Sequence, residues 1–111
     1  MQPTPIEVTC RDVRARREAG QTFLLLDCRE ADEYATAKID GAVLIPMSGI
    51  VDRLAELEPY RSSSVVVYCH HGGRSLRVAN WLRNQGFPQA CSMAGGIDEW
   101  SREIDTTVPR Y

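Results

Sequence analysis

The sequence predicts an α/β fold, with a mostly parallel sheet and helices on both of its faces. Strand-like and helix-like segments alternate from one end of the chain to the other. Two strand-like segments, FLLLD at 23–27 and VVVYC at 65–69, are apolar along nearly their whole length, as expected of strands buried on both sides. Repeated strand–helix units of this kind build parallel sheets between layers of helices.

The first third of the chain is expected to hold two strands and two helices. A short strand over 6–8 precedes a helix that opens on a T-x-x-D capping box at Thr9 and closes at Gly20. The apolar strand 23–27 comes next, and a short helix over 30–37 follows it.

One strand and one helix are expected in the middle of the chain. Residues 42–45 form a strand that Pro46 stops. Ser48 can cap the helix that follows, because three apolar residues fall at spacing i, i+4, i+7: Ile50, Leu54 and Leu57. Pro59 and the serines at 62–64 are expected to form the turn before the next strand.

The last third begins with the strand 65–69 and a loop that contains two glycines. A helix over 74–85 follows, and Gly86 stands at its expected C′ position. This helix turns four residues toward one broad face: Val78, Ala79, Trp81 and Leu82. A strand over 90–93 and a short helix over 97–100 complete the pattern.

Length and composition exclude several classes of protein. We expect 111 residues, of which 43% are hydrophobic, to form one domain spanning 1–111. A net charge of −2 argues against a nucleic-acid-binding surface. No apolar run approaches membrane-spanning length, and residues 1–10 lack a signal-peptide core, so the expected location is cytoplasmic, with no membrane partner.

Cys69 is the candidate nucleophile, at the carboxyl end of a buried strand where sites in parallel sheets form. Gly72 and Gly73 allow the following loop to turn its N–H groups inward. A helix N-terminus and the positive charge of Arg74 are expected to lower the pKa of Cys69 further. Together these features predict a thiolate in a pocket that also binds an anion.

The spacing from Cys69 to Arg74 discriminates between kinds of anion. It is Cys-x4-Arg, whereas dual-specificity and tyrosine phosphatases use Cys-x5-Arg, a loop wide enough for a tetrahedral phosphate. The shorter loop is expected to form a smaller pocket, which suits a sulfur atom carried on cysteine. A cysteine-dependent phosphatase or arsenate reductase on a related fold remains the first alternative.

Five segments, in order along the chain, resemble those of a single-domain rhodanese, a thiosulfate:cyanide-type sulfurtransferase. They are LLLDCRE, Glu33-Tyr34, the pair Ile39-Asp40-Gly41-Ala42 and Ile45-Pro46, VVVYC with CHHGGRS, and Ala90 to Trp100 with GGIDEW. The resemblance implies a three-layer fold around a central, mostly parallel five-stranded sheet. The chain departs from the family at Ala37-Lys38, where the family usually has Gly-His.

The resemblance also implies a two-step reaction at Cys69. The thiolate takes a sulfane sulfur from a donor such as thiosulfate or glutathione persulfide and becomes a persulfide. A nucleophilic acceptor, which is cyanide, a thiol or a sulfur-carrier protein, then removes that sulfur. No cofactor or metal is implied. A non-catalytic rhodanese-like binding module is the second alternative, although such modules often lose the cysteine or the loop glycines.

The remaining candidate site residues each admit two roles. Arg74 contacts the donor anion or pairs with an acidic residue of the scaffold, and Ser75 donates a hydrogen bond to the sulfur or caps the helix. Asp27 and Arg29 are interpreted as a structural pair, with Arg29 reaching the substrate as the other interpretation. Of the last two candidates, His70 and His71, one or both are expected to line the pocket mouth and to tune its charge near neutral pH.

No metal site is expected at these histidines, because adjacent side chains should diverge and no further ligand stands at zinc-site spacing. The other three cysteines are interpreted as core or near-core residues, and none belongs to a C-x-x-C pair: Cys10, Cys28 and Cys91.

Overall fold

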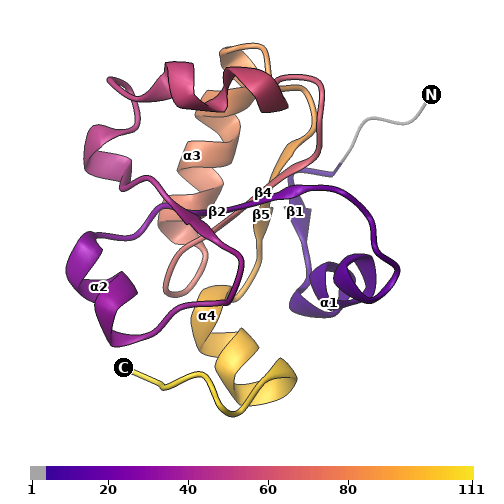
Figure 1. The fold of residues 1–111 in the computed structure, drawn as a ribbon, viewed down its shortest axis with the longest axis vertical. Helices are drawn as coiled ribbons and strands as arrows, with labels where there is room; N and C mark the ends of the chain where they lie inside the picture. The colour runs from indigo at the N-terminus through magenta and orange to yellow at the C-terminus, as the bar shows by residue number, and fades with distance from the viewer. Residues whose placement is uncertain (1–4) are drawn as a thin grey trace.

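A five-stranded sheet in the order β1-β5-β4-β2-β3 forms the centre of the molecule (Figure 1). The structure is a computed structural model, and it describes residues 5–111. All of the strand pairings are parallel. The strands are β1 Glu7–Val8, β2 Leu24–Asp27, β3 Val43–Leu44, β4 Val65–Tyr68 and β5 Ala90–Met93. The predicted α/β class is confirmed, and each strand overlaps the segment in which it was expected.

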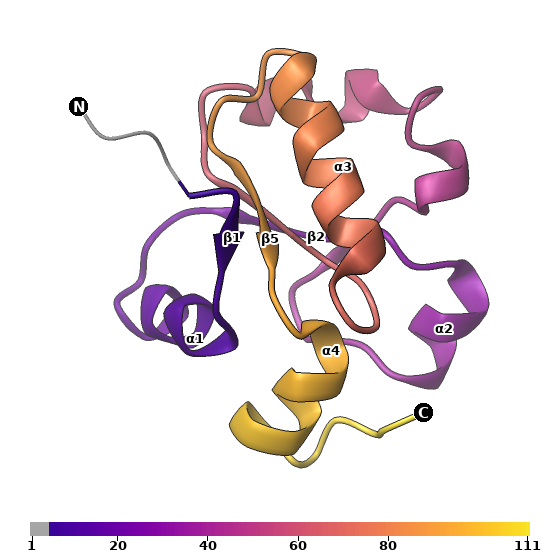
Figure 2. The same ribbon diagram turned by 180° about the vertical axis from the view of Figure 1, so that it is seen from behind.

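Helices lie on both faces of this sheet, and α3 runs along one of them in the foreground of Figure 2. The helices are α1 Cys10–Glu18, α2 Ala31–Thr36, α3 Gly73–Asn84 and α4 Gly96–Glu99, and α4 continues into a wider turn, η3, over Trp100–Ile104. The predicted capping box of α1 is present: the Thr9 side chain accepts the N–H of Asp12, and the Asp12 carboxylate accepts the N–H of Thr9.

The apolar strands β2 and β4 are buried on both faces, as their composition predicts. Leu24 and Leu26 of β2 pack in the layer below α3, with Val65 and Val67 of β4. The residues between them point the other way, toward α1 and η3. Because side chains alternate along a strand, one continuous apolar run supplies both cores.

The prediction of a helix from Ser48 onward is wrong. The chain instead forms two tighter 3₁₀ helices, η1 Met47–Gly49 and η2 Leu54–Tyr60. Pro59 lies inside η2 instead of in the turn after it. The Ser48 hydroxyl donates to the Glu30 carboxylate at 2.8 Å and caps no helix. Burying Ile50 and Leu57 below α3 needs only short turns, and Pro59 cannot donate a helical hydrogen bond.

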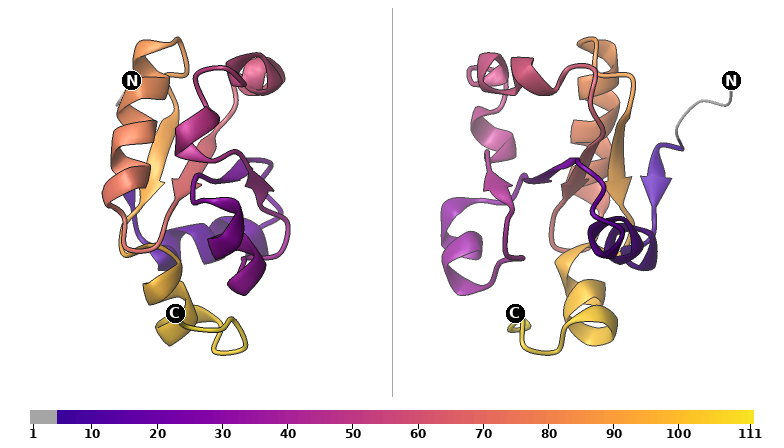
Figure 3. Two further views of the ribbon diagram at one scale, coloured as in Figure 1. Left: turned by 90° about the vertical axis from the view of Figure 1, so that its left-hand side faces the viewer. Right: turned by 45° about the vertical axis from the view of Figure 1, so that its right-hand side comes forward.

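The end of the chain returns to the site described below. Residues 105–111 follow η3, and the chain ends near α2 and below the loop that precedes α3 (Figure 3). Of the N-terminal stretch 1–10, in which no signal-peptide core was expected, the first four residues lie outside the described part. In residues 5–111, no helix has the length and apolar character needed to cross a membrane.

Candidate active site

The loop from Cys69 to Gly72 joins the carboxyl end of β4 to the start of α3. Gly72 has φ of 111°, a left-handed conformation that glycine adopts without strain, and α3 begins one residue later. This turn aims two backbone N–H groups at the Cys69 sulfur. Gly72 donates to Sγ at 3.1 Å and Ser75 at 3.3 Å. The inward-turned loop predicted from the two glycines is therefore present, although only Gly72 uses the left-handed region.

A buried serine pair supports the same sulfur from the side. The Oγ atom of Ser75 lies 3.4 Å from Sγ of Cys69 and 2.7 Å from Oγ of Ser92 on β5. Both serines are fully buried. Of the two roles considered for Ser75, the structure shows the contact with sulfur, while Gly72 occupies the cap position. Sequence reasoning missed Ser92; its signal is a hydroxyl inside the short buried strand 90–93.

Hydrogen bonds keep the Cys69 thiol ionised. They lower the pKa of Cys69 to about 4, from 9.0 for an unperturbed thiol. The hydrogen bond from Cys28 contributes most, burial opposes it, and Ser75 and Gly72 contribute further through a hydroxyl and two backbone N–H groups. Cys69 is therefore a thiolate near neutral pH, and these donors, more than the charge of Arg74, are the leading causes.

The first turn of α4 fixes the loop from below. The N–H of Ile97 donates to the carbonyl of Cys69 at 2.9 Å, and that of Asp98 to the carbonyl of His70 at 3.1 Å. Gly96 has φ of 59°, and a Cβ atom there would overlap both of these carbonyl oxygens. Gly96, the second glycine of the GGIDEW segment, therefore allows the close approach of two backbones, which holds the loop in shape.

Arg74 pairs with an acidic residue of the scaffold. Its guanidinium binds the Glu33 carboxylate through two contacts of 2.7 and 2.9 Å. This bidentate pair is the first cause that lowers the pKa of Glu33 to about 2. The Tyr111 hydroxyl donates to the same carboxylate at 2.8 Å. Arg74 thus ties the start of α3 to α2 through Glu33, a residue that the sequence indicated only as part of the Glu33-Tyr34 segment.

Asp27 and Arg29 form a fully buried ion pair with a shortest N–O distance of 2.6 Å. The remaining donors of the guanidinium reach other parts of the protein, namely the carbonyls of Glu33 and Ala37 and the Tyr111 hydroxyl. This is the arrangement of a structural pair. We therefore do not carry the substrate contact considered for Arg29 into the function proposed below.

The two histidines lie side by side at the loop, and the expectation that they diverge is wrong. Their ring centroids are 3.9 Å apart, and Tyr111 stacks on His70 at 4.0 Å with an interplanar angle of 10°. His71 is exposed over 68% of its side chain and faces Asp98 at 3.9 Å. These two rings and Asp98 could present ligand atoms within 4.8 Å of one another, but the carboxylate already faces Arg102 and Arg110.

The other three cysteines are buried, as expected, and unpaired. Cys10 and Cys91 pack on the α1 side of the sheet, whereas Cys28 packs on the α3 side with Cys69. Sequence reasoning missed the contact between Cys28 and Cys69. Its signal was that each of the two residues directly follows a long apolar strand.

An α/β fold that holds a thiolate against two backbone N–H groups, at the carboxyl end of a parallel strand, is typical of cysteine-dependent transferases and hydrolases. Within that class, the Rhodanese-like domain model matches residues 9–103. The chain belongs to the rhodanese-like domain family, as the sequence resemblance indicated.

The names of two proteins that the chain resembles in sequence refer to sulfur transfer or sulfur carriage. The chain is 33% identical over 114 residues to the maize (Zea mays) adenylyltransferase and sulfurtransferase MOCS3-1, covering 98% of this chain and 24% of the relative. It is 28% identical over 99 residues to the putative sulfur carrier protein YrkF of Bacillus subtilis, covering 89% of this chain and 52% of the relative. The chain therefore spans about a quarter and about half of these two proteins.

Solved structures share the fold along nearly the whole chain. A rhodanese-related protein from Thermoplasma volcanium superposes with a TM-score of 0.79 at 27% identity, covering 90% of this chain and 94% of that one. The human single-domain sulfurtransferase TSTD1 gives a TM-score of 0.77 at 26% identity, covering 93% and 98%. Family and relatives together support sulfur transfer as the general activity.

Proposed function

We propose that the protein is a sulfurtransferase that carries a sulfane sulfur on Cys69. The observation that supports this most is the sulfur of Cys69, which accepts two backbone N–H groups and lies beside the Ser75 hydroxyl. The same donors can stabilise the outer sulfur anion of a persulfide, because hydrogen-bond donors fixed in place cost nothing to reorganise. The roles given to Gly72, Gly73 and Ser75 in holding this anion are part of the proposal.

Sulfur transfer proceeds in two displacements. The Cys69 thiolate attacks the outer sulfur of thiosulfate, the S–S bond of the donor breaks, and sulfite leaves with the electron pair of that bond. With glutathione persulfide the leaving group is the glutathione thiolate. Cyanide, a thiol or a sulfur-carrier protein then attacks the outer sulfur on Cys69, and the Cys69 thiolate leaves. Its low pKa makes Cys69 a good leaving group in this second step.

The position of Arg74 supports sulfur cargo over phosphate. Its guanidinium is committed to Glu33 through both arms, so the anion site consists of the backbone N–H groups, Ser75 and the histidine side chains at the mouth. A single sulfur carried on Cys69 needs no more than these donors, whereas a phosphoryl group carried there has three terminal oxygens and would call on the arginine as well. We assign His70 and His71 to the entrance, where they would meet the donor.

Steady-state kinetics test this function. Wild-type protein with thiosulfate and cyanide, and separately with glutathione persulfide and a thiol acceptor, should turn over in at least one pair of substrates, and C69S should turn over in neither. The ratio of kcat/KM for the two donors then identifies the preferred one. Cys69-dependent hydrolysis of an aryl phosphate, with no sulfur transfer, would instead establish the phosphatase alternative.

The same kinetics separate an enzyme from a binding module. A module would show no turnover in any donor–acceptor pair and would bind its partner equally well as C69A.

A cytoplasmic location remains part of the proposal, since a reducing compartment keeps a thiolate such as Cys69 active. Fractionation of cells with an antibody to the native protein tests it.

A further inference from the structure

Cys28 and Cys69 occupy equivalent places at the ends of neighbouring strands. Asp27 of β2 pairs with Tyr68 of β4, and each of the two cysteines is the next residue along its strand. The N–H of Cys28 donates to the carbonyl of Tyr68 at 3.1 Å, so the hydrogen bonding of the sheet continues as far as Cys28. Neighbouring strands lie about 4.8 Å apart, which falls within the Cα separation of about 4.4–6.8 Å that a disulfide spans.

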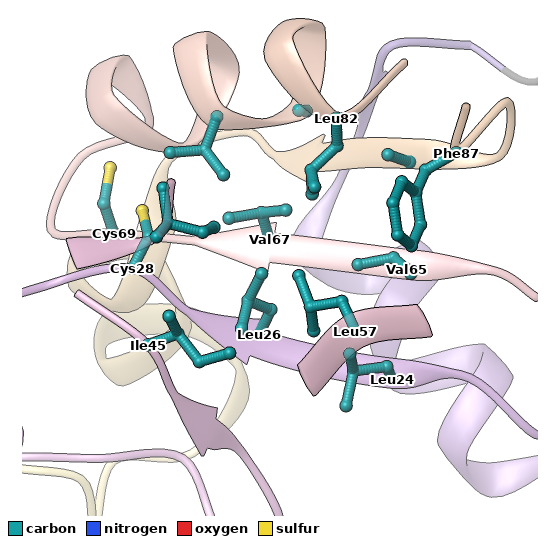
Figure 4. Packing of buried hydrophobic residues seen from close by; sticks show 14 residues of the cluster. Leu24, Leu26, Cys28, Ile45, Leu57, Val65, Val67, Cys69, Leu82 and Phe87 are labelled. Carbon is teal, nitrogen blue, oxygen red and sulfur yellow. The ribbon is translucent and has the colours of Figure 1, made fainter. Parts of the chain in front are cut away.

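The two thiol side chains also point to the same face. Leu26 and Val67, two residues before them, both pack below α3, and alternation returns Cys28 and Cys69 to that side. Figure 4 shows the two sulfur atoms beside each other at the end of this layer, with no labelled side chain between them. The Cys28 thiol lies 3.5 Å from the carbonyl of Tyr68, the residue directly before Cys69. Hydrogen bonding from this thiol to the ionised Cys69 is also the first cause of the low pKa of Cys69.

The other two cysteines lie in the opposite layer. Cys10 and Cys91 pack among residues of the α1 side, across the sheet from Cys69. Of the cysteines in residues 5–111, Cys28 therefore has the one thiol that shares a packed layer with Cys69. This separation makes Cys91, which is as deeply buried as Cys28, a natural control.

We propose that Cys28 is the resolving thiol of Cys69, so that oxidation of Cys69 by a peroxide yields a reversible Cys28–Cys69 disulfide. An ionised, hydrogen-bonded thiol is the form that peroxides attack. A peroxide is no larger than the sulfur donor, so any path that lets the donor reach Sγ of Cys69 also admits the oxidant. In this one respect the inference rests on the proposed function. The disulfide then holds Cys69 at an oxidation state that thiols can reverse.

Two steps lead to the disulfide. First the Cys69 thiolate attacks one oxygen of hydrogen peroxide; the O–O bond breaks, hydroxide leaves, and sulfur is oxidised by two electrons to the sulfenic acid. Then the sulfur of Cys28 attacks Sγ of Cys69; the S–O bond breaks, the Cys28 proton joins the departing hydroxyl, and water leaves. A dithiol such as dithiothreitol reverses the product by disulfide exchange and returns both thiols.

Oxidation itself favours the second step. A hydrogen bond to the Cys69 thiolate is the first cause that raises the pKa of Cys28, followed by burial and the charge on Cys69. Conversion of Cys69 to a neutral sulfenic acid removes the charge responsible for two of these effects. Cys28 therefore stays a protonated donor while Cys69 is reduced and becomes a better nucleophile once Cys69 is oxidised.

Peptide mass spectrometry tests the proposal, because trypsin places each cysteine in a separate peptide. The full-length protein is treated with hydrogen peroxide, denatured, alkylated with N-ethylmaleimide and digested without reductant. We expect peptides 18–29 and 62–74 joined as one species that has lost two hydrogens, and peptides 1–11 and 84–102 alkylated. Dithiothreitol added before alkylation should return at least about nine-tenths of the joined peptides to free thiols.

Variants complete the test. In C28S and C28A, peroxide should carry Cys69 to the sulfinic acid, which dithiothreitol does not reverse, while C91S should give the wild-type disulfide. Two outcomes overturn the proposal: wild-type Cys69 reaching the sulfinic acid as fast as in C28S, or a disulfide from Cys69 to Cys10 or Cys91. These readouts follow peptide masses of the wild type and variants, so they stand even if no sulfur transfer is found.

Discussion

At the scale of single residues, the chemistry of Cys69 follows from the donors around one sulfur atom. Two backbone N–H groups, one thiol and one hydroxyl surround Sγ, and none of them carries a formal charge. Neutral donors held at short range stabilise an anion without trapping it in an ion pair. This suits a sulfur that must alternate between thiolate and persulfide.

The first prediction concerns the pH dependence of Cys69 reactivity. A pKa of about 4 means that the folded protein holds the thiolate at every pH above that value, and the thiol forms only as pH falls through it. The rate of alkylation of peptide 62–74 by iodoacetamide should be constant from about pH 6 to 8 and fall about tenfold per unit below about pH 4. The denatured chain should show its midpoint near 9.0 instead. A folded-state midpoint close to the denatured one would contradict the site geometry.

The second prediction concerns the hydroxyl of Ser75. S75A removes the hydroxyl that lies 3.4 Å from Sγ, so the midpoint of the alkylation profile should move upward and kcat should fall about 10-fold. S101A is the control, since Ser101 is also buried and hydrogen-bonded but bonds to Val108 in the other layer. Equal alkylation profiles for the two variants would show that the Ser75 hydroxyl does not stabilise the Cys69 thiolate.

At the scale of elements, strands were predictable because a strand buried on both faces needs an unbroken apolar run. Residues 24–27 and 65–68 meet that condition, and the residues after them could be placed at the site. The segment 47–60 could not be predicted in the same way. The i, i+3 step from Leu54 to Leu57 suits a 3₁₀ turn as well as an α-helix, and the sequence does not show how Ile50 and Leu57 fill the space below α3.

The third prediction concerns the contact between α4 and the loop. G96A would place a methyl group against the carbonyls of Cys69 and His70 in a left-handed backbone, and should lower the free energy of unfolding by about 2–4 kcal/mol. G49A is the control, because Gly49 has no atom near its added Cβ and should change stability by less than about 0.5 kcal/mol. Urea denaturation measures both, and equal stability of the two variants would refute the role of Gly96.

At the scale of the whole molecule, strand order decides which residues meet. The sequence predicts neither that β4 lies between β5 and β2 nor that α4 supports the loop, and those two facts bring Ser92, Cys28 and Gly96 around Cys69. The signals for these residues were present only as a buried hydroxyl, a cysteine after a strand and a glycine pair. Long-range pairing gave them their roles, and pairing cannot be read from local periodicity.

The buried Asp27–Arg29 pair carries the fourth prediction, because it joins β2, α2 and the C-terminal tail. D27N leaves a buried guanidinium without its counter-charge and should destabilise the protein by about 3–5 kcal/mol. E56Q, in the exposed Arg53–Glu56 pair, should leave the midpoint of urea denaturation nearly unchanged. Urea denaturation at pH 7 distinguishes them, and a small loss for D27N would refute the structural role of the pair.

The most direct test of the account is the mass of the reduced protein after one incubation with a sulfane donor. Wild-type protein, treated with excess thiosulfate or glutathione persulfide and desalted, should gain the mass of one sulfur atom. That sulfur should lie in peptide 62–74, leave on addition of cyanide, and be absent from C69S. A wild-type protein that gains no sulfur from either donor, or gains it equally in C69S, would contradict the claim that Cys69 carries sulfur.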